Sequence, residues 1–489
     1  MKILFVAAEV APFSKTGGLG DVCGALPAAL AARGHQVVTV SPCYGGARVA
    51  GRSWEERGGF WFWLFGAHHE VRFIVSEEGP GLAHVLLANP MYDRGGIYGD
   101  DSGVFGDNQL RYALMARASL EVARAAPLWQ GAPLGEPDIV HAHDWQGALV
   151  PLYLNALYKP IGLFQSTRSV LTLHNAAHQG LFAPSTLGGL DLSGRHAATL
   201  QHDGALNTLK GGIVSADRVT AVSPTFAQEL MTPSGGFGLD GVLRDKRDAG
   251  QLIGILNGID DREWDPSSDP ELLHPFDAAD LSGKARSKEA LQLELGLPRR
   301  ADVPLFGIVS RLDWQKGVEL LLAGSPSIFA QDLQFIVLGL GDPKLHEGLL
   351  ALQRSWPDKI RVRLAKDFSL SHRVFAGSDF IVVPSLFEPC GLTQLYAMRY
   401  GAAPVVRAVG GLRDSVQPWD PSSQAGTGWT FDDFTPGALA ETIGWAAHTW
   451  HTYPEAFARI QQNGMAIDWS WASAAKTFED LYDGINPSR

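Results

Sequence analysis

The chain has few cysteines and no long apolar run. Only Cys23, Cys43 and Cys390 occur among its 489 residues, and no two of them form a CxxC pair. Such an odd, small number is typical of a reducing compartment, so we expect no disulfide and a cytoplasmic location. No apolar run approaches the roughly 18 residues that a membrane span needs. The run after Lys2 ends at Glu9 and is too short for a signal peptide. We expect no membrane association.

A positive charge excess is also absent. The chain has 40 Lys and Arg residues against 52 Asp and Glu residues, and its formal net charge of −12 argues against a nucleic-acid surface. The sequence contains no Asp-x-Asp, an acidic pair that would hold a metal ion against a nucleotide diphosphate. We therefore expect no metal and no other cofactor, and we expect Lys and Arg side chains to neutralise any bound phosphate.

The order of apolar runs predicts an α/β chain. An apolar run at residues 3–7, a glycine-rich loop, a helical pattern at 21–33 and a second run at 36–40 are typical of a doubly wound parallel sheet. Further strands of a first domain are predicted at 138–142, 170–173, 218–222 and 252–256. After a polar, turn-rich stretch at 257–301, the alternation restarts with strands at 305–309, 335–338, 361–364, 380–383 and 404–406. A chain of this length needs more than one core.

We predict three segments. Residues 1–257 form an N-terminal domain, residues 258–465 form a second domain, and residues 466–489 form a helix with Trp469, Trp471, Phe478 and Tyr482 at helical spacing that docks back on the first domain. The aromatic run from Phe60 to Phe65 alternates poorly. A core or hairpin strand is the favoured interpretation of this run over a platform for sugars.

The stretch from Pro384 to Tyr396 is where we expect the chemistry. It follows the predicted strand 380–383, and Glu388 lies in a polar turn. The amides of Gly391, Leu392 and Thr393 are predicted in the first turn of a helix, where unsatisfied N–H groups favour an anion. A carboxylate for hydroxyls beside a phosphate-binding helix start suits a sugar nucleotide, although an ordinary crossover turn has the same pattern.

Cations follow other predicted strands. The loop Ser14-Lys-Thr-Gly-Gly-Leu-Gly-Asp21 is neither a dinucleotide fingerprint nor a P-loop, because Cys23 replaces the third glycine and Lys15 precedes the glycines. An anion-accepting loop and a plain tight turn both fit it. Arg311 and Lys316 follow the strand 305–309 and are suited to a diphosphate, with a surface salt bridge as the alternative.

Histidine, asparagine and glycine end further strands. His141-Ala-His143-Asp144 has the spacing of a metal site, but HxH alone is a weak signal. His174 and Asn257 are suited to hydrogen bonds with a polyol, and a buried His or a turn Asn is the alternative. Another glycine loop is Gly339-Leu-Gly341-Asp342.

These motifs occur together and in order, from Lys15-Thr-Gly-Gly-Leu through His141-Ala-His-Asp-Trp145, Leu256-Asn-Gly-Ile-Asp260 and Ser310-Arg311 to Phe387-Glu-Pro-Cys-Gly-Leu-Thr-Gln394. In this set the chain resembles the bacterial glycogen synthases and the plant starch synthases. The resemblance covers residues 1 to about 482. It implies the GT-B architecture, in which two Rossmann-like doubly wound domains enclose a central cleft.

The resemblance also implies an activity, the transfer of glucose from ADP-glucose to the non-reducing 4-hydroxyl of an α-1,4-glucan such as glycogen, with retention at the anomeric carbon. It assigns catalytic roles to Glu388, Arg311, Lys316 and His174. The implied donor-binding residues are Lys15, Gly17, Gly18, Asn257, Gly339, Gly341, Asp342, Cys390, Gly391, Leu392 and Thr393. The implied residues on the acceptor side are Asp21, Tyr98 and Asp144.

One departure from the family pattern concerns the donor base. Ala365-Lys366 stands where relatives have Gly-Tyr, so the aromatic residue expected beside adenine is missing. The alternatives are a related GT-B enzyme that uses UDP-glucose or a short acceptor, a non-catalytic glucan-binding protein, and a phosphorylase with pyridoxal phosphate.

Overall fold

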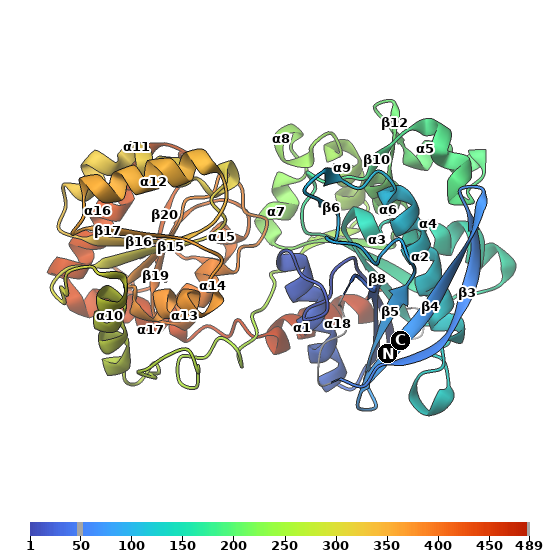
Figure 1. Ribbon diagram of the computed structural model, residues 1–489, viewed down its shortest axis with the longest axis horizontal. Helices are drawn as coiled ribbons and strands as arrows, with labels where there is room; N and C mark the ends of the chain where they lie inside the picture. Colours follow the sequence, from blue (N-terminus) through green and yellow to red (C-terminus); the bar gives the residue numbers. More distant parts are fainter. Residues whose placement is uncertain (46–51, 487–489) are drawn as a thin grey trace. The chain divides into compact units, whose positions relative to one another are not determined.

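The chain folds into two compact units, each built on a mainly parallel sheet (Figure 1). The structure is a computed structural model that describes residues 1–45 and 52–486. The first unit contains Met1–Gly258 and the segment from Trp471 onward, and the second contains Ile259–Ser470. The sequence placed the corresponding boundaries after residues 257 and 465, one and five residues earlier.

The main sheet of the first unit has the order β14-β13-β9-β8-β1-β2-β5-β4-β3. The strands from β14 to β5 in this order are parallel, and β4 and β3 are added antiparallel at one edge. The buried sequences of the central strands β1, β2, β8 and β9, which contain Val, Ile or both, suit parallel strands that are covered on both faces. The bounds are β1 (Lys2–Val6), β2 (Gln36–Pro42), β3 (Glu55–Leu64), β4 (Ala67–Glu78), β5 (Leu82–Ala88), β8 (Ile139–His143), β9 (Arg168–Leu173), β13 (Arg218–Ala221) and β14 (Leu252–Gly254).

Helices and short strands complete the first unit. The short strands are β6 (Gly99–Asp100), β7 (Gly103–Val104), β10 (Leu181–Phe182), β11 (Gln201–His202) and β12 (Ala205–Asn207). The helices are α1 (Gly18–Ala32), α2 (Asn108–Ala125), α3 (Asp144–Gly147), α4 (Leu149–Tyr153), α5 (Ala197–Leu200), α6 (Thr208–Ser215), α7 (Pro224–Glu229), α8 (Pro233–Gly236) and α9 (Asp240–Asp248).

The second unit has a parallel sheet in the order β17-β16-β15-β18-β19-β20. Numbered from its first strand, this is the 3-2-1-4-5-6 order of the Rossmann fold. The strands are β15 (Leu305–Val309), β16 (Gln334–Gly339), β17 (Ile360–Leu364), β18 (Phe380–Val383), β19 (Ala403–Arg407) and β20 (Trp429–Phe431). The helices are α10 (Ser282–Leu295), α11 (Val318–Phe329), α12 (Pro343–Ser355), α13 (Phe368–Gly377), α14 (Thr393–Arg399), α15 (Gly410–Ser415), α16 (Pro436–Thr452) and α17 (Pro454–Met465).

Each face of the second sheet carries its own core. Phe306 packs into one cluster, where its ring stacks on those of Phe335 and Phe380, and Leu305 packs into the cluster on the opposite face. Adjacent residues of a strand point to opposite faces, so the continuous apolar run of β15 serves both cores. Because both faces of β15 are buried, its sequence is an unbroken apolar run, and this run was correctly predicted to be a strand.

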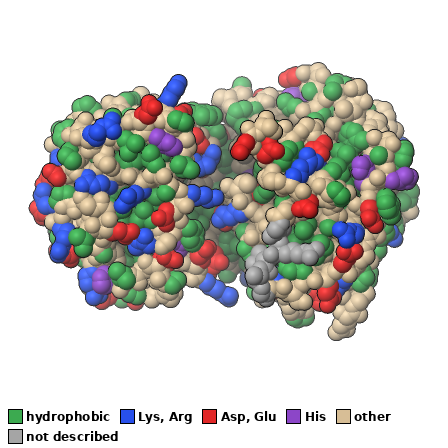
Figure 2. Space-filling model, in the orientation of Figure 1, with side chains coloured by type: hydrophobic (Ala, Val, Ile, Leu, Met, Phe, Trp, Pro, Cys, Tyr) green, Lys and Arg blue, Asp and Glu red, His purple; other side chains and the backbone are tan. Residues whose placement is uncertain are grey.

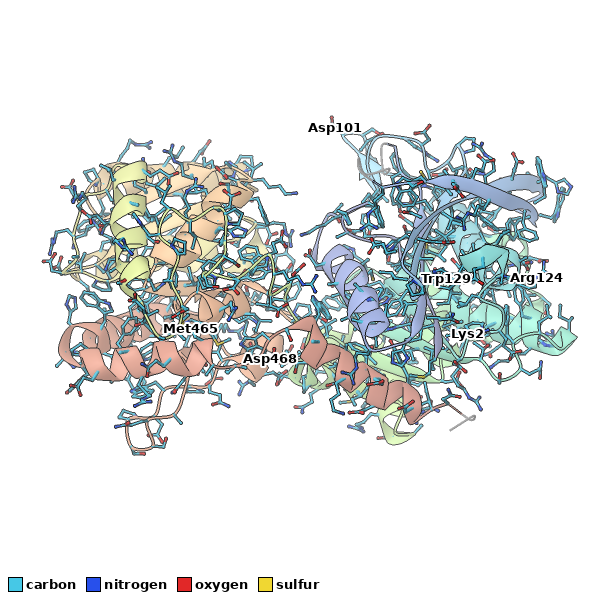
Figure 3. All side chains as sticks on the ribbon, turned by 90° about the horizontal axis from the view of Figure 1, so that it is seen from below. Lys2, Asp101, Arg124, Trp129, Met465 and Asp468 are labelled. Carbon is cyan, nitrogen blue, oxygen red and sulfur yellow. The ribbon has the colours of Figure 1, made fainter. Side chains whose placement is uncertain are left out.

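The last helix, α18 (Trp471–Asp483), belongs to the first unit. Its residues Phe478 and Tyr482 pack with Leu26 of α1 and Phe5 of β1. Figure 3 shows the segment between Met465 and Asp468 that leads from α17 toward it. The prediction that Trp469 lies on this helix is wrong: Asp468 accepts a hydrogen bond from the Ser470 amide (2.9 Å) in a turn before the helix, and Trp469 packs on the second unit's core.

The aromatic run from Phe60 to Phe65 lies largely on strand β3, which pairs antiparallel with β4. The hairpin interpretation is thus confirmed, and the burial of the run alternates although its apolar sequence does not. Phe62 and Leu64 are buried, whereas Trp61 and Trp63 are exposed. No helix in the described part of the chain is long and apolar enough to cross a membrane. On the face drawn in Figure 2, acidic and basic side chains are interspersed within each unit.

Candidate active site

In the second unit, three catalytic candidates lie at the point where the strand order reverses. Strands β15 and β18 are neighbours there, with Gly307 beside Ile381. In open α/β sheets, ligands bind beyond the carboxyl ends of the strands at such a switch point. The segments that leave these two strands carry Arg311 and Lys316 on one side and Glu388 on the other. The topology therefore brings together residues that are about 70 positions apart in the sequence.

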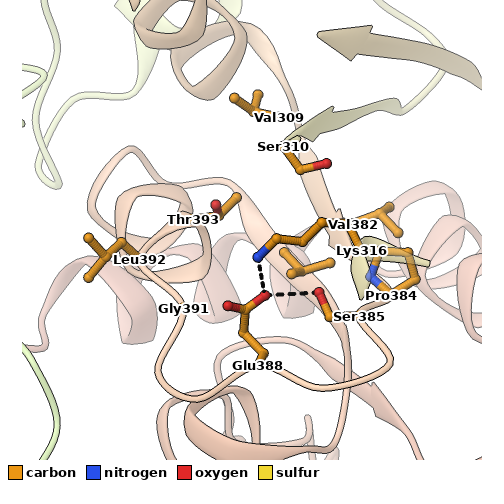
Figure 4. Close-up of a pocket in the computed structure, with 11 residues that line it drawn as sticks. Val309, Ser310, Lys316, Val382, Pro384, Ser385, Glu388, Gly391, Leu392 and Thr393 are labelled. Carbon is orange, nitrogen blue, oxygen red and sulfur yellow. Dashed lines mark hydrogen bonds and ion pairs between the residues drawn. The ribbon is translucent and has the colours of Figure 1, made fainter. Parts of the chain in front are cut away.

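Lys316 and Glu388 form the centre of this group (Figure 4). The Lys316 ammonium lies 2.6 Å from Oε2 of Glu388, and the Ser385 hydroxyl donates to the same oxygen at 2.9 Å. The two charged side chains are only 18% and 9% exposed. Because both bonds fall on one carboxylate oxygen, the direction of the Glu388 side chain is well defined.

A small pocket of about 50 Å³ adjoins this pair, lined by residues that include Ser310, Lys316, Glu388, Gly391 and Thr393. Ligand sites for drug-sized molecules have about 300–1,000 Å³. This pocket therefore has room for one group of a ligand rather than for a whole nucleotide sugar. Among the described residues that line it, Glu388 is the only acid.

Arg311 projects from the same edge. Its side chain is 66% exposed, pairs with Asp313 at 2.6 Å and contacts Oε1 of Gln315 at 3.3 Å. Gln315 in turn donates to the carbonyl of Phe387 at 3.2 Å, which ties the segment after β15 to the segment after β18. The guanidinium is thus held on a turn with much of its surface open to a ligand.

The start of α14 differs from the prediction. The helix begins at Thr393, so Gly391 and Leu392 precede its first turn. Gly391 has a φ of +73°, and a Cβ there would lie 2.5 Å from the side chain of Gln394. The buried Gln394 amide donates to the Gly391 carbonyl at 2.9 Å and lies 3.0 Å from the Ser415 hydroxyl. This contact shapes the turn, and the carbonyl of the buried Cys390 lies beside it.

The loop Gly339-Leu-Gly341-Asp342 has a clear packing role. A Cβ at Gly339 would lie 2.0 Å from the Ser310 carbonyl, and one at Gly341 would lie 2.1 Å from the Leu312 carbonyl. Asp342 caps α12 by accepting a hydrogen bond from the Lys344 amide at 2.8 Å. These glycines therefore let the loop lie directly against the segment that carries Arg311.

In the first unit, the switch point lies between β1 and β8, and Glu9 is its central buried acid. Glu9 is 2% exposed and accepts hydrogen bonds from the Thr16 hydroxyl (2.7 Å), the Thr16 and Gly17 amides and the Tyr98 hydroxyl. These contacts hold the glycine loop against the end of β1. Sequence reasoning missed Glu9, although a lone acid directly after an apolar strand is a signal for it.

Lys15 extends from this loop and pairs with Asp21 at 2.5 Å. Burial raises the pKa of Asp21 in spite of this pairing. The Gly17 amide donates to Glu9 at 3.3 Å, so the backbone of the loop is anchored at this residue. A Cβ at Gly17 or Gly18 would meet no atom within 4 Å, so the outer side of the loop is open.

Three histidines lie together on or directly after β8 and β9: His141 and His143 are fully buried, and His174 is partly buried. His141 contacts the hydroxyls of Tyr482 (2.7 Å) and Thr172 (2.6 Å) through its two ring nitrogens, so it has none left for a metal. His143 Nδ1 lies 3.0 Å from Nε2 of His174. Burial lowers the pKa of His174 to about 3, so this imidazole is neutral. A ligand contact from His174 would use Nδ1.

Asp144 positions the neighbouring strand end. Its carboxylate accepts hydrogen bonds from the amides of His174 (2.7 Å) and Asn175 (3.4 Å), and its backbone has a φ of +49°, which is unusual for a residue other than glycine. Burial raises its pKa to about 7. Asn257, beyond the end of β14, is also buried.

Family models cover most of the chain. Residues 2–245 match the model described as the starch synthase catalytic domain, and residues 296–464 match glycosyl transferases group 1. The catalytic domain of starch synthase IV from Arabidopsis thaliana, solved with ADP and acarbose, is similar over 100% of this chain and 99% of its own, with 34% identity and a TM-score of 0.87. The protein is thus a glycosyltransferase of the GT-B architecture.

Curated relatives narrow the assignment. A glycogen synthase from Anaeromyxobacter sp. (strain Fw109-5) is 45% identical over 99% of both chains. Starch synthase 1 from Arabidopsis thaliana is 38% identical over 99% of this chain and 77% of its own. The chain belongs to the glycogen synthase and starch synthase family.

Proposed function

We propose that the protein transfers glucose from ADP-glucose to the non-reducing 4-hydroxyl of an α-1,4-glucan, with retention at the anomeric carbon. The observation that carries this proposal is the Lys316–Glu388–Ser385 group at the switch point of the second sheet, in a chain 34% identical to a starch synthase solved with ADP and acarbose. A cation for phosphate lies there beside a carboxylate for sugar hydroxyls.

Charge stabilisation is the main task of the protein in this reaction. As the bond from the anomeric carbon to the diphosphate breaks, negative charge grows on the leaving oxygens. Arg311 and Lys316 neutralise this charge, and Lys15 contributes a further cation. Glu388 aligns glucose hydroxyls, and the neutral His174 offers a hydrogen bond to the glucosyl group.

The pocket supports a front-face route to retention. Double displacement in retaining glycosidases uses two carboxyl groups about 5–5.5 Å apart. Here Glu388 is the only acid among the described residues that line the pocket, and its Oε2 is bound by Lys316 and Ser385. In the proposed route, the departing diphosphate itself accepts the proton of the acceptor hydroxyl while that hydroxyl oxygen bonds to the anomeric carbon.

The remaining assignments are part of the same proposal. Donor binding involves Gly17, Gly18, Asn257, Gly339, Gly341, Asp342, Cys390, Gly391, Leu392 and Thr393. Asp21, Tyr98 and Asp144 shape the acceptor side. A cytoplasmic location is supported by the low cysteine content, and none of the three cysteines forms a disulfide in the described structure.

Nucleotide release tests the proposal. The protein is incubated with ADP-glucose or UDP-glucose, with and without glycogen, and the free nucleoside diphosphate is measured. We expect ADP release that depends on glycogen. Release that does not depend on glycogen would contradict transfer to a glucan, and faster release of UDP than of ADP would contradict the assigned donor.

A further inference from the structure

Another cavity lies in the second unit, away from the catalytic candidates. Its volume is about 1130 Å³, whereas sites for drug-sized molecules typically have about 300–1,000 Å³. Helices α10 and α17, which lie on the same side of the sheet, both contribute to its lining (Figure 1). Asp379, which directly precedes β18, also lines it, whereas Glu388 lies beyond the carboxyl end of that strand. The cavity is therefore separate from the candidate active site.

Basic side chains outnumber acidic ones around this cavity. The described residues that line it include four basic and two acidic side chains, namely Lys284, Arg286, Lys288, Arg299, Glu289 and Asp379. In a chain of net charge −12, this local excess of positive charge favours an anion. The excess is two charges, and a phosphate monoester carries about 1.5 to 2 negative charges near neutral pH. A phosphate monoester therefore matches the cavity in charge.

Arg286 is the basic group that is most open to a ligand. Lys288 is buried and pairs with Asp379 at 2.6 Å, and Arg299 pairs with Glu289. Arg286 is exposed on α10, and its guanidinium forms no hydrogen bond with any residue that the structure describes. A guanidinium binds phosphate in a bidentate geometry. Trp450, Pro454 and Phe457 line the same cavity, so an apolar surface is available beside this cation.

Lys284 connects the cavity to two helices of the second unit. It is buried, and its ammonium donates to the carbonyls of Phe375 (3.2 Å) and Ala376 (3.0 Å) in the last turn of α13. It also donates to the carbonyl of Tyr400 (2.9 Å), which directly follows α14. A cation among the last carbonyls of a helix is favoured by the helix dipole. One ammonium thus holds the carboxyl ends of α13 and α14 together.

The opposite ends of these two helices lie on the donor side of the second unit. Helix α14 begins at Thr393, which lines the small pocket beside Glu388. Helix α13 begins at Phe368, two residues beyond Lys366, in the segment assigned to the donor base. Packed helices are rigid, so a change at their carboxyl ends can be transmitted to their first turns. Lys284 is therefore placed to couple the cavity to the donor site.

An anion in the cavity would change the charge of Lys284. Burial lowers the pKa of Lys284 to about 7, Asp379 opposes this shift and Lys288 adds to it. The charged ammonium has three N–H donors for the three carbonyls, whereas a neutral amine has only two. A nearby negative charge favours the charged form. Binding of an anion therefore strengthens the connection between α13 and α14.

We propose that this cavity is a regulatory site for a small organic phosphate with an apolar ring, and that its occupant strengthens nucleotide binding through Lys284, α13 and α14. The phosphate meets the Arg286 guanidinium, and the ring packs on the apolar wall that contains Trp450 and Phe457. Binding at the cavity is independent of the proposed function. The effect on the donor rests on that function, because it assigns the nucleotide site to ADP-glucose.

The first measurement is calorimetry with phenyl phosphate, a phosphate monoester with an apolar ring, and with inorganic phosphate. Arg286→Glu reverses one charge at the cavity. Arg354→Glu on α12 is the matched control, because Arg354 is exposed and does not line the cavity. We expect wild type to bind phenyl phosphate more tightly than inorganic phosphate. Arg286→Glu should weaken this binding about tenfold or more, as for the loss of a charge-assisted hydrogen bond, and the control should behave as wild type.

The second measurement is the affinity for ADP at pH 8, with and without saturating phenyl phosphate. At this pH Lys284 is mostly neutral unless an anion is bound nearby. We expect phenyl phosphate to lower the Kd for ADP about fivefold, at the lower end of typical allosteric couplings, and to have this effect in Arg354→Glu but not in Arg286→Glu. At pH 6, where Lys284 is already charged, the effect should be small. Phenyl phosphate that competed for the ADP site would instead raise this Kd.

Three binding results would overturn the site: no binding of phenyl phosphate to wild type at millimolar concentrations, equal binding to Arg286→Glu, or an equal loss in Arg354→Glu. An ADP affinity that phenyl phosphate leaves unchanged or weakens at pH 8 would overturn the regulatory role. Neither measurement requires turnover. A protein that shows both effects but transfers no glucose to a glucan would therefore contradict the proposed function alone. If Arg286→Glu does not fold, Arg286→Ala takes its place.

Discussion

The ammonium of Lys316 lies 2.6 Å from Oε2 of Glu388, so the cation assigned to the diphosphate and the acid assigned to the sugar neutralise each other. Both side chains are largely buried. A bound diphosphate would also attract the Lys316 ammonium. Donor binding would therefore weaken the ion pair between Lys316 and Glu388. The first prediction follows from this relationship.

Glu388→Gln should separate sugar alignment from nucleotide binding. The substitution keeps the shape and one acceptor oxygen but removes the charge. We expect kcat to fall about 10- to 100-fold, since a hydrogen bond to a charged group is worth about 1.5–3 kcal/mol. ADP affinity, measured by calorimetry, should stay the same or rise because Lys316 is released. A large fall in ADP affinity would place Glu388 on the nucleotide side.

Arg311→Ala should affect the chemical step more than glucan binding. The exposed guanidinium is assigned to charge that grows on the leaving diphosphate, and loss of one such preorganised group costs about 10²- to 10³-fold in kcat. The exposed Arg300, which pairs with Asp302 and Asp332 on the same unit, provides the matched control Arg300→Ala. A kcat for Arg311→Ala within a few-fold of wild type would remove Arg311 from the leaving group.

Asp144→Asn should stabilise the protein at high pH. Burial raises the pKa of Asp144 to about 7, against about 3.9 in an unfolded chain. Between these values the folded state holds a proton that the unfolded state has lost, so this group's stabilising contribution falls as pH rises and is lost above about pH 7. An asparagine side chain does not titrate, so the variant loses no stability through this position as pH rises.

The measurement is the urea midpoint of Asp144→Asn minus that of wild type, from pH 5 to pH 8.5. The difference should grow with pH and level off above about pH 7. Subtraction removes the opposite contribution of His141 and His174, whose pKa burial lowers to about 3 and whose stabilising effect is lost in acid. A flat difference for Asp144→Asn would contradict the buried carboxyl.

Lys366→Tyr should sharpen the choice of donor base. Lys366 is exposed between β17 and α13, at the position where the family resemblance led us to expect an aromatic residue. Stacking of an aromatic side chain on a base is worth about 1–3 kcal/mol. We expect a modest wild-type ratio of kcat/KM for ADP-glucose over UDP-glucose, and an increase in Lys366→Tyr, chiefly through KM for ADP-glucose.

Phe368 offers the alternative for the base. It is 53% exposed and lies two residues beyond Lys366. If the wild type already prefers ADP-glucose by several hundred-fold and Lys366→Tyr changes nothing, another side chain covers the base. Phe368→Ala would then be the variant that lowers the preference.

The sequence was sufficient to predict the strands and the polar residues that follow their carboxyl ends. Parallel strands buried on both faces are continuous apolar runs, and their carboxyl ends are polar where a ligand binds. For this reason the sequence alone could place Arg311, Lys316 and Glu388 at one edge of a sheet. The pairing of Lys316 with Glu388 was not predicted.

Contacts between distant segments could not be predicted from the sequence in the same way. Glu9 holds the glycine loop through groups of Thr16, Gly17 and Tyr98, and the last of these lies 89 residues away. The close approach of Gly339 to the Ser310 carbonyl depends on the pairing of β15 with β16. The outward direction of Trp61 and Trp63 depends on the register of β3 with β4. Each requires the tertiary structure, because the local sequence is compatible with several arrangements.

Chain elongation is the most direct test of the central claim. Maltohexaose is incubated with ADP-glucose, the products are resolved by mass spectrometry, and the new glycosidic linkage is identified by proton NMR. The account predicts maltoheptaose and longer products, one ADP released for each glucose added, and only α-1,4 linkages. Products of unchanged length, or a β linkage at the added glucose, would contradict it.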